Sequence, residues 1–263
     1  MKTVKISREP FSCFRRGLKI CGSVFLCSEA PQKLPVAVLC HEFMADEHFC
    51  YEYAKTLAEC GYAAFTFDFC GGSLSGKSEG DTRDMSALTE AEDIKAVIEF
   101  AHRQPFADEA GVLLLGCSQG GFAAALAAAQ LKDEVRGLIM LYPALSIPDD
   151  ARSGKMLGAS FDPENIPDTI NCGPMLLGRR YVEDVINMEV YAEITKYTGP
   201  VLILHGDKDA VVDTDYSKRA ARLYRAQGAD ARLKIIEGGK HVFRKKKHID
   251  EVKKYITAFA WNL

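Results

Sequence analysis

The stretch Gly116-Cys117-Ser118-Gln119-Gly120-Gly121 decides the fold class of this chain. It follows an apolar run at residues 112–115, which is typical of a buried strand, and it precedes an Ala-rich helix expected over residues 119–130. In this context the pattern G-x-S-x-G forms a sharp turn that exposes the serine oxygen at the edge of a sheet. The sequence therefore predicts Ser118 as a nucleophile on a strained backbone. The N–H of Gln119 is one candidate donor to a developing oxyanion.

Short apolar strands alternate with amphipathic helices along the rest of the chain. Strands are expected over residues 18–27, 35–40, 63–69, 112–115, 135–142, 201–204 and 233–236, and helices over 47–60, 85–103, 119–130, 214–226 and 249–261. Such alternation produces right-handed βαβ units, so we predict an α/β fold with a mostly parallel sheet and helices on both faces. Ligands bind such sheets beyond the carboxyl ends of the strands.

One long segment interrupts this alternation. Between the strand that ends near Tyr142 and the strand that starts near Val201, the chain is rich in proline and glycine. Connections usually have roughly 4–6 residues. Apolar residues spaced through the segment argue against disorder. We therefore predict an inserted cap, or lid, over residues 145–198, with residues 1–144 and 199–263 forming the core.

A base must take the proton from a serine hydroxyl, and a third group must orient that base. His241 ends the loop Glu237-Gly238-Gly239-Lys240-His241, directly after the last expected strand, and we predict it as the base. The other histidines fall on helices, in a basic run, at a strand end or too early in the chain, at positions 48, 102, 248, 205 and 41. Of these, His205 fits a structural role.

Three aspartates that follow the strand at residues 201–204 compete for the orienting role. We favour Asp209, whereas Asp207 is the alternative and could instead brace the turn. Asp213 is expected to cap the next helix. The order serine, acid, histidine along the chain is that of the α/β-hydrolase fold, which we therefore predict for the core.

The composition excludes several other classes of protein. The chain has 263 residues, of which 48% are hydrophobic and 26% charged, with a formal net charge of −3. These values allow a large core and lack the basic excess of a nucleic-acid binder. The basic run at residues 244–248 opens the last expected helix, and we interpret it as a solvated helix end.

The nine cysteines form no Cys-x-x-Cys pair and lie mostly in or beside apolar runs. Free thiols of this kind behave as small buried hydrophobic groups. Residues 1–5 lack the apolar region of a signal peptide, and no stretch approaches the roughly 18 apolar residues of a membrane helix. We therefore expect reduced thiols, a cytoplasmic location and no membrane partner.

A second glycine-rich stretch matches a nucleotide-binding pattern. Residues 71–78 read Gly-Gly-Ser-Leu-Ser-Gly-Lys-Ser, which fits the P-loop motif. A P-loop requires its lysine and serine to open a helix, whose amides then face the phosphates. Here the polar residues 79–82 follow, without an apolar period. We interpret the stretch as a flexible connection near the rim of the active site.

The chain resembles the bacterial cinnamoyl (feruloyl) esterases of the α/β-hydrolase superfamily from about Leu18 onward. The resemblance rests on five core motifs and two cap motifs. They are His41-Glu42-Phe43, Asp68-Phe69-Cys70-Gly71-Gly72, the stretch at residues 116–121, His205-Gly206-Asp207-Lys208-Asp209, residues 237–241, Asn165-Ile166-Pro167-Asp168 and Leu177-Gly178-Arg179-Arg180-Tyr181. The cap motifs are more specific, because the whole superfamily shares the triad.

The resemblance implies Ser118, Asp209 and His241 as the catalytic triad. It also implies that the backbone N–H groups of Phe43 and Gln119 form the oxyanion hole. By position, Asp150 and Tyr181 would hold the phenolic hydroxyl of a hydroxycinnamate acyl group. Asp149 is adjacent to Asp150, and helix capping by the aspartates and core packing by Tyr181 are alternatives.

One residue departs from the pattern of the family, which usually has glycine where this chain has Glu42. If that glycine has a positive φ, Glu42 carries backbone strain. A carboxylate near the oxyanion hole would also oppose the negative charge, which puts the role of Phe43 in question. Cys117, where the family commonly has histidine, is a milder departure, and we expect its thiol to point into the core and to be inert.

The sequence thus predicts a serine carboxylester hydrolase that acts through an acyl-enzyme on hydroxycinnamate esters. The alternatives are a short-chain acyl esterase, a monoacylglycerol lipase, a thioesterase and a catalytically silent binding protein. We expect no cofactor and no metal. The expected partner is a small-molecule ester rather than nucleic acid, and a homodimer is one candidate assembly.

Overall fold

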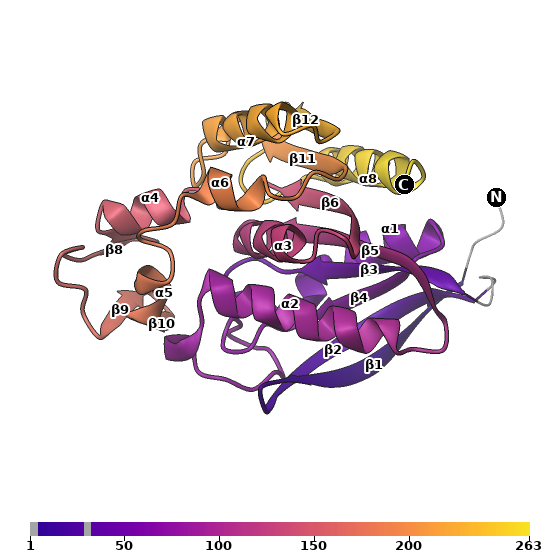
Figure 1. The fold of residues 1–263 in the computed structure, drawn as a ribbon, viewed down its shortest axis with the longest axis horizontal. Helices are drawn as coiled ribbons and strands as arrows, with labels where there is room; N and C mark the ends of the chain where they lie inside the picture. The colour runs from indigo at the N-terminus through magenta and orange to yellow at the C-terminus, as the bar shows by residue number, and fades with distance from the viewer. Residues whose placement is uncertain (1–4, 29–32) are drawn as a thin grey trace.

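The computed structural model describes residues 5–28 and 33–263 (Figure 1). The prediction that the chain has no signal peptide falls largely on residues 1–4, outside the described residues. Within the described ranges, no helix is both long and apolar enough to cross a bilayer. All nine cysteines are free in the structure.

A central sheet organises the molecule. In the described residues it has eight strands in the order β1-β2-β4-β3-β5-β6-β11-β12. The strands are β1 (Ile6–Arg15), β2 (Leu18–Cys27), β3 (Leu34–Cys40), β4 (Ala63–Phe67), β5 (Ala107–Cys117), β6 (Val135–Leu141), β11 (Val201–Gly206) and β12 (Ala231–Ile236). From β4 to β12 every neighbouring pair is parallel, which confirms the predicted α/β architecture.

The first strand was not predicted. β1 pairs with β2 as an antiparallel hairpin at the edge of the sheet, and β2 pairs antiparallel with β4. β1 contains Pro10 and is exposed at several positions. Proline has no N–H to donate to a ladder, and an edge strand tolerates it because one side of such a strand has no neighbouring strand. This composition hid the strand, since its pattern does not alternate cleanly between apolar and polar residues.

Helices cover both faces of the sheet. The helices of the core and the two 3-10 turns are η1 (Glu47–Cys50), α1 (Tyr51–Glu59), η2 (Thr82–Asp84), α2 (Ala87–His102), α3 (Gln119–Gln130), α7 (Thr214–Ala226) and α8 (Lys246–Ala260). Buried side chains of α1 and α8 form one apolar cluster with the sheet, whereas those of α2, α3 and α7 form another. Figure 1 shows α2 and α3 side by side in front of the sheet.

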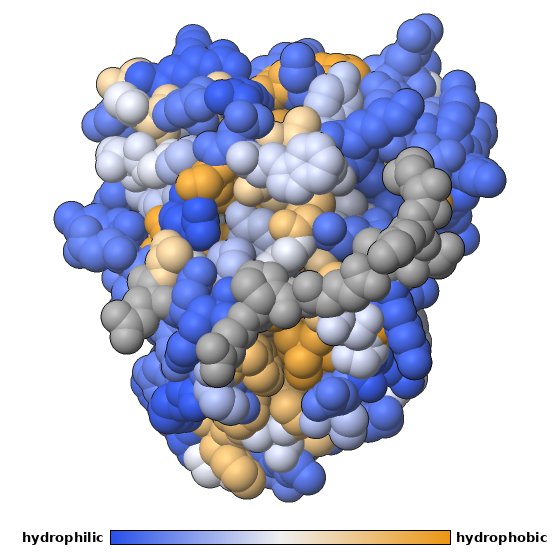
Figure 2. Space-filling view, turned by 90° about the vertical axis from the view of Figure 1, so that its right-hand side faces the viewer, coloured by the Kyte–Doolittle hydropathy of each residue, from blue (hydrophilic) through white to orange (hydrophobic). Residues whose placement is uncertain are grey.

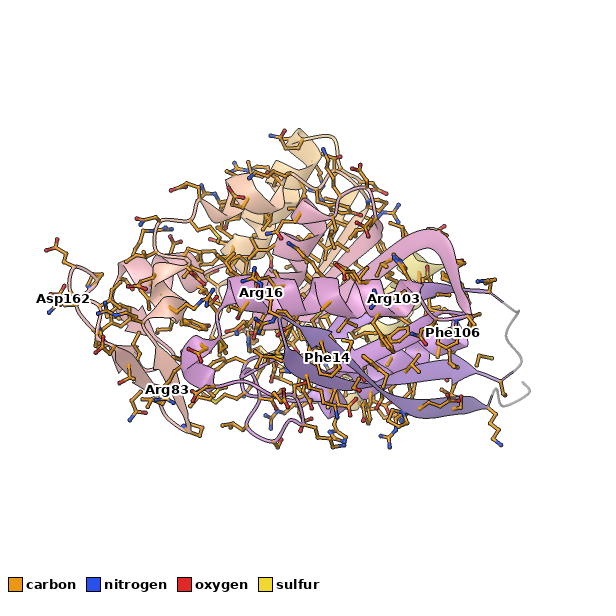
Figure 3. The ribbon with its side chains drawn as sticks, turned by 60° about the horizontal axis from the view of Figure 1, so that its bottom comes forward. Phe14, Arg16, Arg83, Arg103, Phe106 and Asp162 are labelled. Atoms are coloured by element: carbon orange, nitrogen blue, oxygen red, sulfur yellow. The ribbon has the colours of Figure 1, made fainter. Side chains whose placement is uncertain are left out.

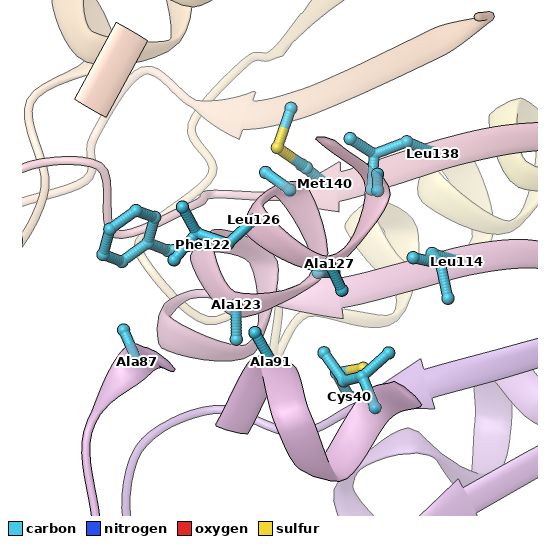
Figure 4. Close-up of a cluster of buried hydrophobic side chains, with 14 of the residues drawn as sticks. Cys40, Ala87, Ala91, Leu114, Phe122, Ala123, Leu126, Ala127, Leu138 and Met140 are labelled. Carbon is cyan, nitrogen blue, oxygen red and sulfur yellow. The ribbon is translucent and has the colours of Figure 1, made fainter. Parts of the chain in front are cut away.

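Small side chains bring α3 close to its neighbours. Ala87 and Ala91 of α2 lie near Ala123 of α3, and Leu114 and Met140 of the sheet belong to the same buried cluster (Figure 4). Alanine at these positions lets the helices approach each other closely while keeping a high helix propensity. The N-terminus of α3, where Ser118 stands, is therefore held between α2 and the carboxyl ends of β5 and β6.

The segment between β6 and β11 carries its own short elements. They are α4 (Ile147–Arg152), β7 (Lys155–Met156), β8 (Ala159–Ser160), β9 (Thr169–Cys172), β10 (Met175–Gly178), α5 (Arg180–Glu183) and α6 (Val190–Ile194). Most of this segment projects beyond the carboxyl ends of the strands, and Figure 3 places Asp162 at its outer tip. Its buried residues belong to the same apolar cluster as those of α2 and α3, so the cap and the core share one apolar interior.

The glycine-rich stretch at residues 71–78 does not form a P-loop. The turn η2 begins at Thr82 and α2 at Ala87, so Lys77 and Ser78 open no helix. Asp68 holds this stretch in place: its Oδ2 accepts from the Lys77 N–H at 2.7 Å, and its carbonyl accepts from the Ser78 hydroxyl at 2.6 Å.

The end of the molecule opposite the cap is hydrophilic over most of its margin, with smaller apolar areas between (Figure 2).

Candidate active site

Ser118 occupies the strained turn that its motif predicts. It lies between β5 and α3 with φ 49° and ψ −117°, a conformation that is rare for residues other than glycine. A Cβ at Gly116 would lie 2.2 Å from the Gly120 carbonyl oxygen, and one at Gly120 would lie 2.2 Å from the His41 carbonyl oxygen. These close approaches explain why glycines flank the serine.

His241 contacts both of the groups predicted to be its partners. Its Nε2 lies 2.9 Å from Ser118 Oγ, and its Nδ1 lies 2.7 Å from Asp209 Oδ2. Because the carboxylate only accepts, Nδ1 carries the proton and donates it to Asp209. Nε2 is then the acceptor for the serine proton. The structure therefore brings together Ser118, His241 and Asp209, which are separated widely in the sequence.

Asp209 is held by a second histidine that the sequence assigned to a structural role. His205 is fully buried, and its Nε2 lies 3.0 Å from Asp209 Oδ2 and 3.1 Å from the Val212 carbonyl oxygen. Both neighbours are acceptors, so His205 Nε2 carries a proton. Burial alone would raise the pKa of Asp209, but hydrogen bonds from His205, His241 and the N–H groups of Val212 and Val211 hold this pKa well below its usual range.

The two competing aspartates have other partners. Asp207 Oδ1 accepts from the Gly238 N–H at 2.6 Å, so it braces the two loops that carry Asp209 and His241. Asp213 caps α7 by accepting from the Asp215 N–H at 2.9 Å, as the sequence predicts. In the structure Asp209, and not Asp207, contacts His241.

The two residues expected to supply the oxyanion hole line the same cavity. Phe43 and Gln119 both line it beside Ser118, and neither backbone N–H donates to another described residue. His41 fixes the loop before Phe43: its Nε2 accepts from the Phe69 N–H at 3.1 Å, and its Nδ1 lies 2.7 Å from the Glu42 carbonyl oxygen. Nδ1 therefore donates, and burial lowers the pKa of His41, which keeps the ring neutral.

The expectation of backbone strain at Glu42 is wrong. The positive φ in this loop falls on the next residue but one, Met44, at 67°, and Glu42 itself avoids this region. The Glu42 side chain turns toward Tyr142, whose hydroxyl lies 3.5 Å from Glu42 Oε2. Burial raises the pKa of Glu42 to about 6, although the nearby His241 and Arg244 favour its charged form.

Tyr142 is a residue that the sequence reasoning missed as part of the site. It follows β6 directly with φ 38°, and its ring centroid lies 4.8 Å from that of His241. This packing helps to fix the orientation of the imidazole. Its position just beyond the carboxyl end of a central strand was the available signal, because this is where ligand-binding residues gather in such sheets.

A cavity of ≈ 370 Å³ opens in front of Ser118. Asp150 of α4 and Tyr181 of α5 line it, together with Phe43 and Gln119. Asp150 accepts from the Ser146 hydroxyl at 2.9 Å, and burial raises its pKa. This cavity is large enough for an aromatic acyl group.

The adjacent aspartate, Asp149, lies outside the cavity lining. It pairs with Arg152 and accepts from the Tyr216 hydroxyl at 2.8 Å. Of the two candidates that the sequence left open, Asp150 is therefore the one that faces the cavity. Tyr181 is fully buried and donates its hydroxyl proton to Gln119 Oε1, which leaves its oxygen able to accept from a ligand.

Gln119 also connects the site to a buried carboxyl group. Its Nε2 donates to Glu90 Oε1 at 2.7 Å, while Glu90 Oε2 has no partner among the described residues. Burial raises the pKa of Glu90 to about 8, so the group is largely protonated at neutral pH. The side chains of Glu90, Gln119 and Tyr181 thus link α2, α3 and the cap.

A small hairpin of the cap forms one wall of the cavity. β7 and β8 are joined by Leu157 and Gly158, with φ 49° and 87°, as in a type I′ turn. Leucine is unusual at such a position, because its Cβ is strained there. Leu157 is 49% exposed and lines the cavity, which places an apolar side chain at its mouth.

Comparison with solved structures supports the fold over the full chain. The structure of Est1E from Butyrivibrio proteoclasticus with ferulic acid bound is 31% identical, has a TM-score of 0.87 and is matched over 96% of this chain and 98% of that one. The structure of DcsB in complex with its substrate analogue is 19% identical, with a TM-score of 0.74, over 97% of this chain and 99% of that one. The predicted α/β-hydrolase fold is confirmed.

The model of the prolyl oligopeptidase family matches residues 48–263, and the chain belongs to this family of α/β hydrolases. An uncharacterized 31.7 kDa protein from the traX-finO intergenic region of Escherichia coli is 34% identical over 107 residues, which is 40% of this chain and 36% of that protein. The human monoglyceride lipase is 29% identical over 161 residues, or 51% of this chain and 52% of that protein. The chain thus spans only about a third to a half of the length of these curated relatives.

Proposed function

We propose that this protein is a serine esterase that hydrolyses hydroxycinnamate esters through an acyl-enzyme. The observation that carries the proposal is the hydrogen-bonded series Ser118, His241 and Asp209, whose serine lines a cavity that is also lined by the acidic side chain of Asp150. The similarity to Est1E, whose structure holds ferulic acid, supports the choice of acyl group.

In the first half of the reaction, Ser118 Oγ attacks the ester carbonyl carbon while His241 Nε2 takes the hydroxyl proton. The carbonyl oxygen becomes an oxyanion that accepts from the N–H groups of Phe43 and Gln119. The C–O bond to the alcohol then breaks, and His241 returns its proton to the leaving oxygen. Asp209 stabilises the imidazolium throughout, without becoming protonated.

In the second half, water takes the place of the alcohol. His241 removes a proton from the water, the resulting hydroxide attacks the acyl carbon, and the C–O bond to Ser118 breaks with return of the proton to Oγ. The acid product leaves and the free serine is restored. A phenolic hydroxyl on the acyl group would donate its single proton to Asp150 or to Tyr181 Oη, since both can accept.

The proposal is tested by measuring hydrolysis of methyl ferulate and of p-nitrophenyl butyrate by wild type and by Ser118→Ala. We expect the wild type to prefer methyl ferulate strongly and the variant to lose both activities. Turnover of butyrate alone would leave the serine mechanism and remove the hydroxycinnamate assignment. Failure of the wild type to cleave either ester would favour a binding role. The first explanation to test would then be that the carboxylate of Glu42 opposes the negative charge of the oxyanion.

Monoacylglycerol hydrolysis is the second candidate. It is favoured by the similarity to monoglyceride lipase and by two exposed apolar side chains at the cavity, Leu157 and Val211. An acyl chain would meet these side chains, whereas a phenolic ring would reach Asp150. Comparing kcat/KM for a monoacylglycerol and for methyl ferulate decides between the two.

A further inference from the structure

A second cavity lies beside His241. It measures ≈ 480 Å³, and its lining includes His241 but not Ser118. Val211 lines both this cavity and the one in front of Ser118, so the two are neighbours that share a wall. We call it the basic cavity, because of the side chains described next.

All the permanently charged side chains that line the basic cavity are cationic. Lys208 follows β11, Lys240 follows β12, and Arg244 and Lys245 precede α8. Among the described residues, Lys208 has a distant ion pair with Asp207 at 3.8 Å, and the other three have none within 4.0 Å. Two loops, β11–α7 and β12–α8, thus bring four cationic side chains to one cavity.

The carboxylates around this cavity are already engaged or lie outside its lining; Asp207, for example, accepts from the Gly238 N–H and is not part of the lining. Glu42 is close enough to Arg244 for that charge to favour its ionised form, but it faces Tyr142. Asp209 accepts from two histidines, and the exposed Glu237 does not line the cavity. An external anion is therefore the group that this lining can still accept.

His248 provides an independent observation that points to a ligand. It is 3% exposed, it lines the basic cavity, and its Nε2 has no hydrogen-bond partner among the described residues. This atom would lie 3.9 Å from a Cβ placed on Gly238, which is another residue of the lining. A buried ring nitrogen without a partner costs free energy, which a ligand atom could recover.

The N-terminus of α8 adds to the attraction for an anion. Its N-cap, Lys245, makes no side-chain capping hydrogen bond, and the first turn contains no acidic residue. The free N–H groups and the positive end of the helix dipole therefore have no negative partner within the helix. Such helix starts are known to hold carboxylate and phosphate groups.

We propose that the basic cavity is a subsite for a carboxylate or phosphate group on the alcohol half of the ester substrate. The proposal rests on the esterase function proposed above, because His241 must return its proton to the leaving oxygen. The alcohol half therefore leaves beside His241, while the acyl half occupies the cavity in front of Ser118. An ester whose alcohol carries a negative charge would place that charge among Lys240, Arg244 and His248.

The test compares butyrate esters that differ only in the leaving group. These are 4-carboxyphenyl butyrate, 4-(phosphonooxy)phenyl butyrate and, as the uncharged reference of similar size, 4-carbamoylphenyl butyrate. We expect kcat/KM of the wild type to be at least about tenfold higher for a charged ester than for the reference at low salt, and the ratio to fall as ionic strength rises. The two charged esters distinguish a carboxylate site from a phosphate site.

In the variant Lys240→Gln/Arg244→Gln/Lys245→Gln, kcat/KM for a charged ester should be close to kcat/KM for the uncharged reference, so that their ratio is near one. Lys247→Gln is the matched control, because it removes an exposed charge from the first turn of α8 that does not line the cavity. A ratio near one in the wild type, or a high ratio that survives in the triple variant, would overturn the proposal. A loss of the ratio in Lys247→Gln would likewise show that general charge, rather than the subsite, is responsible.

A binding measurement separates failure of this subsite from failure of the esterase function. Inorganic phosphate is titrated into the wild type while the ring resonances of His248 are followed by NMR. A saturable shift that is absent from the triple variant supports the anion site even if no ester is cleaved. Esters that are cleaved without any phosphate-dependent shift and without a charge preference leave the esterase function and refute the subsite.

Discussion

The carboxyl edge of the central sheet and the inserted cap contribute different parts of the candidate site, and they differ in how tightly their residues are held. At the sheet edge, hydrogen bonds of 2.9 and 2.7 Å link Ser118 to His241 and His241 to Asp209. Gly116 and Gly120, on either side of Ser118, lie close against backbone atoms of neighbouring segments. In the cap, the cavity wall is a hairpin of two-residue strands with a strained, exposed Leu157.

The difference assigns separate tasks to the two regions. Groups that take part in bond making and breaking must be held within a fraction of an ångström, and rigid elements provide this. Groups that choose a substrate can lie on an insertion that varies while the sheet is kept. Changes at the sheet edge should therefore affect every substrate, whereas changes in the cap should alter the preference among substrates.

The largest expected effect belongs to Asp209→Asn. An amide in place of the carboxylate can donate to His241 Nδ1 and so favours the tautomer that cannot accept the serine proton. We expect kcat to fall by roughly 10⁴-fold for every ester, with the fold unchanged. Steady-state kinetics on methyl ferulate and p-nitrophenyl butyrate check this, and Asp207→Asn is the control. A loss of activity toward only one of the two esters would contradict the claim that changes at the sheet edge affect every substrate.

Glycine-to-alanine substitutions compare the two regions directly. A Cβ at Gly120 would lie 2.2 Å from the backbone oxygen of His41, whereas Gly158 in the cap hairpin has open space around it and only an unfavourable φ of 87°. We expect Gly120→Ala to reduce the free energy of unfolding by roughly 3 kcal/mol or more and Gly158→Ala by about 1 kcal/mol. Urea unfolding measures both. Equal losses in the free energy of unfolding would contradict the claim that the sheet edge is more tightly packed than the cap.

Glu90 tests the junction between the regions, because it lies behind Gln119 and Tyr181. Its pKa of about 8 in the folded state exceeds the ordinary value of 4.5, so the folded protein keeps a proton that the unfolded chain releases between these pH values. This contribution to stability is therefore lost as pH rises toward 8. Glu90→Gln removes the titration.

We expect Glu90→Gln to gain on the order of 1–3 kcal/mol of stability relative to wild type between pH 5 and pH 9. Denaturant unfolding at several pH values measures the gain. Glu99→Gln, an exposed position on the same helix, is the control and should show no such trend. A pH-independent difference between Glu90→Gln and wild type would mean that Glu90 is already ionised in the folded state.

Sequence patterns predicted the sheet edge much better than the cap. The helices at residues 119–130 and 214–226 have the predicted bounds, because a motif or an N-cap marks their starts. Ser118, Asp209 and His241 could be predicted because each lies on the segment that follows a strand of the sheet. The edge strand β1 was missed, since its exposed residues and Pro10 obscure the alternation.

The sequence indicated an inserted cap but could not describe its elements. Its strands have two to four residues, too few for a periodic signal, and they are formed by turns such as that at Leu157. The contact of His205 with Asp209 and the packing of Tyr142 on His241 depend on side-chain directions fixed only by the tertiary fold. Likewise, Glu42 was expected to be strained because the position of the positive φ, at Met44, cannot be read from residue types.

The smallest expected effect concerns the choice of substrate by the cap. Asp150→Ala removes an acceptor that a phenolic hydroxyl would use, and a hydrogen bond to a charged group contributes roughly 1.5–3 kcal/mol. Since Tyr181 Oη can still accept, we expect kcat/KM for methyl ferulate to fall only about tenfold relative to methyl cinnamate, which lacks the hydroxyl. Asp149→Ala, whose partners lie outside the cavity, should leave this ratio unchanged. If both esters lose activity equally, Asp150 acts through Ser146 on the shape of the cap, and recognition of the hydroxyl must come from another residue.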